Sequence, residues 1–170
     1  PVLASLPQEP EGVSLSSQEI SRRKFERKFL VLCAQHPAYG LKCAETLAVT
    51  HWHERVHEAL ATSILDTLAA DSSASAGTVV TRATESVPIA GSILTGSFRD
   101  DDQQTASVEA FARYLCEELA LGDLSESIED MKAQLSQNSL SDEERDIIFQ
   151  AVVALQKDVQ IRKKAMKPLI

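Results

Sequence analysis

Apolar residues recur every three or four positions through most of this chain, and that period is typical of amphipathic helices packed on one face. The strongest repeats lie in the second half of the chain. They run from Val108 to Leu119, from Leu124 to Leu135 and from Ile148 to Met166. Glycine and proline, which interrupt helices, contribute only six residues each among 170. The sequence therefore predicts an all-α fold.

Capping patterns locate two of the helix starts. Ser16 is followed three residues later by Glu19, and Ser141 by Glu144, as in the capping box that satisfies the first backbone amides of a helix. The first box predicts a helix over 17–35, which Pro37 would end. The remaining apolar repeats predict helices over 38–49, 51–69, 124–137 and 142–166.

Two regions leave alternatives open. Residues 78–98 are rich in β-branched side chains and could form two short helices split before Pro88 or short strands, and we favour the helices. The apolar stripes on either side of Gly122 are out of phase. Either a helix breaks at this glycine, or one long helix continues and its buried face shifts.

The composition predicts three parts along the chain. Residues 1–16 carry three prolines and several serines without periodicity, which indicates a linker from an upstream domain. Residues 17–120 are expected to form a helical bundle, and residues 121–170 a C-terminal helical hairpin. No apolar run is long enough to cross a bilayer, so we expect no membrane contact.

Charge and cysteine content exclude several classes of function. The net charge of -8 opposes strong direct binding of nucleic acid, which depends on cationic contacts to phosphates. The three cysteines are odd in number and form no Cys-x-x-Cys motif, so we expect reduced core residues in a cytoplasmic protein. A protein partner is the better expectation.

One short motif suggests an enzyme. The residues His53-Glu54-x-x-His57 match the zinc-protease pattern, in which two histidines one helical turn apart bind the metal and the glutamate acts as general base. The extended form of that motif needs glycine at 60 and histidine at 63, where this chain has Leu60 and Ser63. We therefore expect these three side chains on the solvated flank of a helix. A zinc-dependent hydrolase remains the alternative hypothesis.

Beyond this motif the sequence predicts no chemistry. No nucleophile elbow or glycine-rich phosphate loop occurs, and we expect no catalytic, cofactor-binding or metal-binding residue. Because side chains on a solvated flank contribute little, alanine at both His53 and His57 is expected to change stability by under about 0.5 kcal/mol.

The chain resembles the C-terminal, helicase-binding domain of bacterial DnaG-type DNA primases over nearly all of residues 18–167. An aliphatic helix led by an acidic residue closes on Gln-His-Pro, here Glu26, Phe29, Leu30, Leu32, Gln35, His36 and Pro37. A His-Pro-x-hydrophobic helix start follows in the family and is similar to Trp52, His53, Glu54, Val56, His57 and Leu60, with Glu54 in place of the usual proline. The last helix, DEERDIIFQAVVALQKDVQIRKKAM, looks like the family's ending.

The resemblance implies a function without catalysis in this chain. A domain of this family has a helical bundle and a terminal hairpin that contacts the hexameric, DnaB-type replicative DNA helicase, which recruits the primase to the replication fork for RNA primer synthesis. A single-stranded DNA-binding protein is a further candidate partner, and the catalytic domain of such a primase is absent here. An unrelated helical adaptor is the remaining alternative.

The hairpin supplies the candidate contact residues. If the stripe from Ile148 to Val159 holds the hairpin together, residues on its flanks remain free for a partner, and Phe149 is the natural anchor. The predicted partner-binding residues are Arg145, Phe149, Gln156 and Arg162.

Overall fold

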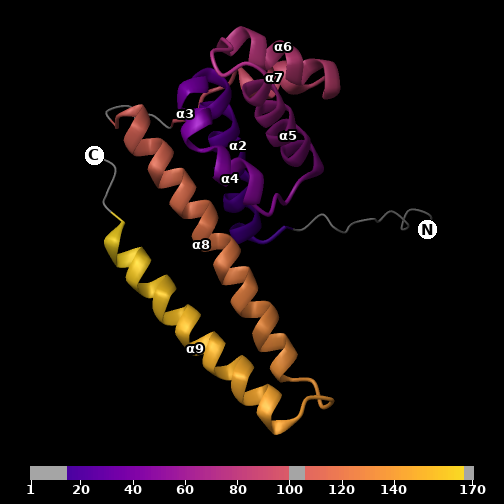
Figure 1. Ribbon diagram of the computed structural model, residues 1–170, viewed down its shortest axis with the longest axis vertical. Coiled ribbons are helices and arrows are strands. Elements are labelled where there is room, and N and C mark those ends of the chain that lie inside the picture. Colours follow the sequence, from indigo (N-terminus) through magenta and orange to yellow (C-terminus); the bar gives the residue numbers. More distant parts are fainter. Residues whose placement is uncertain (1–14, 100–105, 167–170) are drawn as a thin grey trace, which may run out of the picture.

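The computed structural model describes residues 15–99 and 106–166, where the chain forms eight α-helices and no strand (Figure 1). The predicted all-α fold is therefore confirmed. The predicted linker, residues 1–16, lies almost entirely outside the described residues. The helices are α2 (Ser17–Gln35), α3 (Pro37–Lys42), α4 (Ala44–Val49), α5 (Arg55–Ala70), α6 (Ala76–Ser86), α7 (Ala90–Leu94), α8 (Val108–Leu135) and α9 (Asp142–Ala165).

Helix α2 is the central element of a bundle formed by α2 to α7 and the first half of α8. Residues 29–34 are consecutive and all buried, so every side of this part of α2 is covered by neighbouring helices. It packs against α3, α5, α6, α7 and α8. The helix spans the predicted residues. The Ser16 hydroxyl accepts a hydrogen bond of 3.1 Å from the backbone amide of Glu19, as expected of an N-cap residue.

The prediction of one continuous helix over 38–49 was wrong. The chain forms α3 and α4 instead, and the non-helical backbone of Cys43 separates them. The turn at Cys43 brings Leu47 into the core, where its side chain is 1% exposed. The uncertain region after α5 is helical, and α6 and α7 are separated by residues 87–89, as the helical alternative predicted.

The start of the predicted helix over 51–69 was also wrong. Helix α5 begins at Arg55, and Glu54 before it has an extended backbone. The turn before the helix is held by tertiary contacts, because the backbone amide of His53 donates to the carboxylate of Glu26 on α2 at 3.0 Å. His53 and Glu54 therefore lie outside the helix that the motif requires.

Helix α8 is continuous through Gly122, which decides between the two alternatives for this region. Its 28 residues extend over about 42 Å. Its first half packs into the bundle through residues such as Phe111 and Leu119, and its second half packs against α9 through Leu121 and Ile128. The buried face thus shifts along one unbroken helix, and the predicted boundary at residue 120 falls inside it.

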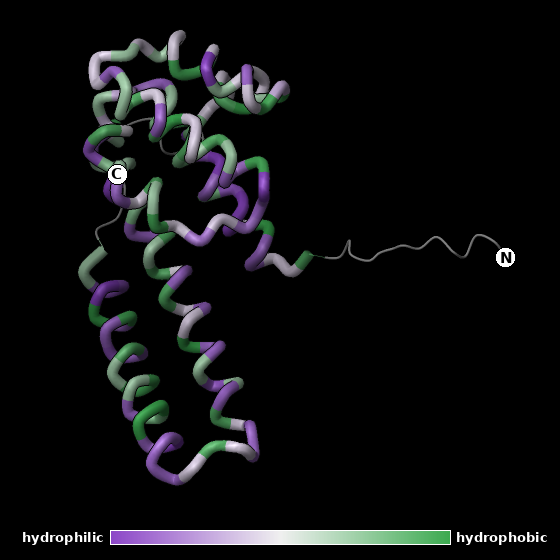
Figure 2. The backbone as a smooth tube through the Cα atoms, turned by 45° about the vertical axis from the view of Figure 1, so that its right-hand side comes forward, coloured by the Kyte–Doolittle hydropathy of each residue, from purple (hydrophilic) through white to green (hydrophobic). Residues whose placement is uncertain are grey.

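Helices α8 and α9 form an antiparallel hairpin that projects from the bundle (Figure 1). Figure 2 shows apolar residues at intervals along both helices. The core of the hairpin is separate from that of the bundle and is small: among the described residues, Leu121, Ile128, Val152 and Val159 are buried in it. The predicted capping box at the start of α9 is complete, with both of its hydrogen bonds between Ser141 and Glu144 present.

Gly122 lies where α8 leaves the bundle, and its lack of a side chain makes room for Arg22. A Cβ on residue 122 would overlap the Arg22 guanidinium, which is held in place by the carbonyl oxygen of Leu119 at 3.0 Å and the carboxylate of Asp123 at 2.6 Å. We therefore expect Gly122→Ala to lower the free energy of unfolding by about 1 to 3 kcal/mol, the usual cost of overpacking.

Urea denaturation measures this change, and Gly77→Ala is the matched control. Gly77 lies in α6, where a Cβ would meet nothing closer than 3.8 Å, so alanine should keep or raise stability. If both variants were stabilised alike, the Arg22 contact would not be what requires a glycine at position 122.

Candidate functional site

A buried carboxylate lies at the centre of the junction between the bundle and the hairpin. Glu26 on α2 is fully buried and accepts hydrogen bonds from Arg22 Nε at 2.8 Å and from Nδ1 of both His53 and His57 at 2.7 Å. Burial alone would raise the pKa of this carboxyl, but the hydrogen bonds, led by that of His57, outweigh burial and lower the pKa to about 2. Glu26 is therefore ionised at neutral pH.

The histidines of the zinc-protease motif are used by this network. His57 is 1% exposed, with Nδ1 on Glu26 and Nε2 at 3.3 Å from Glu54, and His53 is mostly buried in front of the helix. The prediction that both histidines lie on the solvated flank of a helix was therefore wrong. They do not form the pair of ligands, one helical turn apart, that the motif requires. Alanine at both positions is now expected to destabilise the fold, because the buried Glu26 would lose two hydrogen-bond donors.

Arg22 connects three separate segments at the junction. Besides Glu26, it donates to the carbonyl oxygen of Leu119 on α8, to that of His51 in the turn between α4 and α5, and to the carboxylate of Asp123. The guanidinium can hold all of these because its donors form a rigid fork. The Arg22 side chain is only 10% exposed and Glu26 is fully buried, so the contact between these two is well shielded from water.

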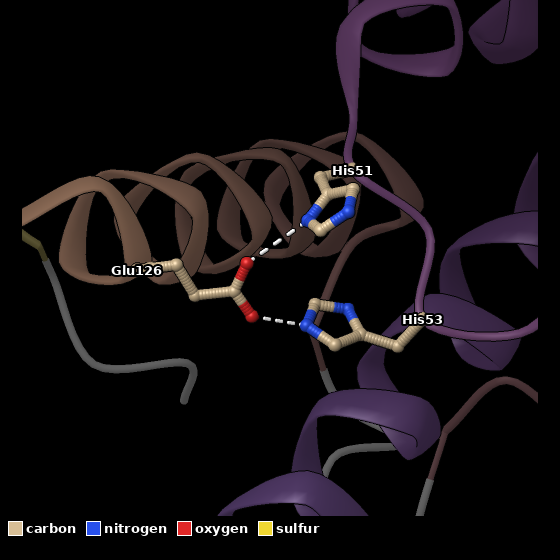
Figure 3. Close-up of side chains that lie close together, drawn as sticks. All are labelled: His51, His53 and Glu126. Atoms are coloured by element: carbon tan, nitrogen blue, oxygen red, sulfur yellow. Dashed lines mark hydrogen bonds and ion pairs between the residues drawn. The ribbon is translucent and has the colours of Figure 1, made fainter. Parts of the chain in front are cut away.

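A second group of side chains lies beside this network and is called here the junction cluster, His51, His53 and Glu126. Figure 3 shows both imidazoles pointing at the carboxylate of Glu126 on α8. His51 Nδ1 lies 3.0 Å from one oxygen, and His53 Nε2 contacts the other. The hydrogen bond to Glu126 raises the pKa of His51. Burial would raise the pKa of Glu126, but the hydrogen bonds from both histidines outweigh it, and the pKa is lowered.

The junction cluster opens into a cleft of about 740 Å³ between α2 and α8. Further carboxylates line the same cleft, including those of Glu118, Glu129 and Asp130. The cleft is therefore accessible from solvent and is negatively charged on the side of α8.

The four predicted partner-binding residues lie in different environments. Phe149 is 57% exposed, and Gln156 is half-buried. Arg145 donates to the carbonyl oxygens of Leu135 and Gln137 at the hairpin turn. Arg162 makes two hydrogen bonds of 2.9 Å to the Glu117 carboxylate. Both arginines therefore have partners within the chain, and these hydrogen bonds hold the two ends of the hairpin together.

The half of α9 that faces away from α8 carries more exposed apolar side chains than the sequence analysis identified. We call Ile147, Phe149, Val153 and Ile161 the exposed α9 face; their exposed fractions are between 48% and 69%. Three of these residues were missed because only the packed stripe from Ile148 to Val159 was followed. Their signal was present as apolar residues at positions outside that stripe.

The cysteines agree in part with the expectation of reduced core residues. All three are free thiols, and Cys33 is buried in the bundle. Cys43 and Cys116 are half-buried, and their sulfur atoms lie 3.4 Å apart.

The chain matches no protein-family model, no curated protein and no solved structure. Among the described helices, none is long and apolar enough to cross a membrane.

Proposed function

We propose that this chain is the helicase-binding domain of a bacterial DnaG-type primase, acting in the cytoplasm, and that the exposed α9 face contacts the replicative helicase. The observation that carries the proposal is this face, because four of the nine large apolar side chains that are exposed among the described residues lie on α9. Clusters of exposed apolar side chains are characteristic of protein-binding surfaces. The resemblance in sequence supports the helicase as the partner.

The shape of the molecule suits a recruiting role. The hairpin projects from the bundle (Figure 1). Phe149 and Val153 are both exposed and lie four residues apart on α9, so both side chains can enter one groove of a partner. The two arginines at the ends of the hairpin hold α9 against α8 before binding, which reduces the ordering cost of association. The primer-synthesising domains of such a primase would then be delivered to the helicase at the fork.

Replacing Phe149 with alanine in the full chain is expected to weaken helicase binding by roughly 30-fold, which corresponds to about 2 kcal/mol at an aromatic hot spot. The affinity can be measured by titrating the labelled chain with a purified hexameric, DnaB-type helicase and following fluorescence anisotropy. Adding Val153→Ala should weaken binding further.

Val49→Ala is the matched control, because Val49 is 68% exposed on α4 of the bundle. Its affinity should stay within about twofold of the unchanged chain, since it lies outside the proposed face. Failure of the unchanged chain to bind the helicase would reject the proposal. Loss of binding in Val49→Ala, with none in Phe149→Ala, would move the contact surface to the bundle.

A further inference from the structure

The junction cluster has the donor set of a metal site. His51, His53 and Glu126 each offer one ligand atom, and these atoms all lie within 4.8 Å of one another. Ligand atoms around a tetrahedral zinc ion are about 3.3 Å apart, so small side-chain rotations would bring the three atoms to bonding distance. Both histidines come from the turn between α4 and α5, whereas Glu126 comes from α8, so the chain brings the three together only when it folds (Figure 3).

The surroundings of His53 orient it as metal-binding histidines are usually oriented. Its Nδ1 donates to the buried carboxylate of Glu26, which leaves Nε2 directed at Glu126. A carboxylate that accepts a hydrogen bond from the second ring nitrogen of a histidine ligand fixes the tautomer of that histidine and makes its metal-binding nitrogen more basic. Here that carboxylate is itself held by Arg22 and His57, so the orientation of His53 is set before any ion binds.

His51 is held by its backbone. Its amide donates to the Asp123 carboxylate at 3.0 Å, and its carbonyl oxygen accepts from Arg22 at 3.0 Å. The ring itself is largely exposed and lies at the mouth of the cleft. An ion can therefore reach the cluster from solvent, and a water molecule has room to occupy a fourth position.

The carboxylate of Glu126 faces both imidazoles. Nδ1 of His51 lies on one of its oxygens and Nε2 of His53 on the other. A metal ion bound at this point can be held by both imidazoles and the carboxylate together.

We propose that His51, His53 and Glu126 bind a divalent transition-metal ion of the zinc class at the junction between the bundle and the hairpin. Two imidazoles and one carboxylate suit zinc, whereas magnesium and calcium prefer sites made of oxygen atoms. The ion would tie the turn between α4 and α5 to α8 one helical turn after Gly122. It would thereby fix the direction in which the hairpin leaves the bundle. This site shares His53 with the zinc-protease motif but does not use His57, so its ligand set differs from that of the motif.

Isothermal titration of the tag-free full chain with zinc chloride at neutral pH tests the site. We expect saturable binding of one ion per chain, and replacing zinc with cobalt should give the visible absorption of a tetrahedral nitrogen and oxygen site. His51→Ala and Glu126→Gln should each weaken zinc binding by about tenfold or more. Both side chains are substantially exposed, 73% and 42%, so the variants should fold.

Glu129→Gln is the matched control, because Glu129 lies on the same helix and lines the same cleft without joining the cluster. Its zinc affinity should equal that of the unchanged chain. Zinc should also raise the melting temperature of the unchanged chain and of Glu129→Gln, and not that of His51→Ala. Absence of saturable binding, or equal binding by all the variants, would overturn the proposal and leave the cluster as a metal-free ion pair between histidine and glutamate.

Discussion

Replacing Glu26 with alanine is expected to lower the free energy of unfolding by about 3 to 5 kcal/mol, the loss typical when one member of a buried ionic network is removed. The carboxylate is fully buried and accepts from Arg22, His53 and His57. Without it, the Arg22 guanidinium would lack its buried counter-charge, and two imidazole N–H groups would lack an acceptor. The alanine would also leave a cavity beside α5.

Urea denaturation followed by circular dichroism measures this loss. Glu26→Gln keeps the volume and one acceptor oxygen, so its loss should be smaller, though still well above that of a surface change. Glu85→Gln is the control, because Glu85 is exposed on α6, and its effect should stay under about 0.5 kcal/mol. A change of under 1 kcal/mol for Glu26→Ala would show that the network does not stabilise the junction.

The second large effect is expected from an aromatic residue of the bundle core. Phe111 on α8 is fully buried, and the centroid of its ring lies 6.0 Å from the ring centroids of Phe98 and Tyr114. Phe111→Ala removes this packing and leaves a cavity, so we expect the free energy of unfolding to fall by about 3 to 5 kcal/mol.

Phe149→Ala is the matched control, since it makes the same chemical change at a ring that is 57% exposed. Its stability should change by less than about 1 kcal/mol. The two variants thus separate packing from the proposed binding, because Phe149→Ala should keep its stability and lose helicase affinity. Equal losses of stability would mean that the Phe149 ring is packed within the hairpin and is not available to a partner.

Local sequence signals were sufficient for the class of fold and for several helix ends. The span of α2 and the cap of α9 follow from Ser16 with Pro37 and from Ser141 with Glu144, because capping depends on residues three or four positions apart. Helices α6 and α7 also agree with the helical alternative that the sequence favoured for this region. There, burial of residues such as Val79 outweighs the strand preference of β-branched side chains.

The site depended on contacts between residues far apart in the chain. His53 and His57 have the spacing of a zinc motif, yet their environment is set by Glu26, about thirty positions upstream. In the same way, the sequence of α9 alone could not show that Arg145 and Arg162 are hydrogen-bonded within the chain, because the oxygen atoms that accept their hydrogen bonds lie on α8 and in the hairpin turn.

The sequence by itself determined that the chain is helical, where α2 and α9 begin, and which side of each helix is apolar, because these properties depend on neighbours within one or two turns. Only the tertiary structure decided that α8 continues through Gly122, where the missing side chain is required by Arg22, a hundred residues away. It alone brought His51 and His53 to Glu126. Packing brings together groups that no local pattern relates, so the candidate site is a property of the fold.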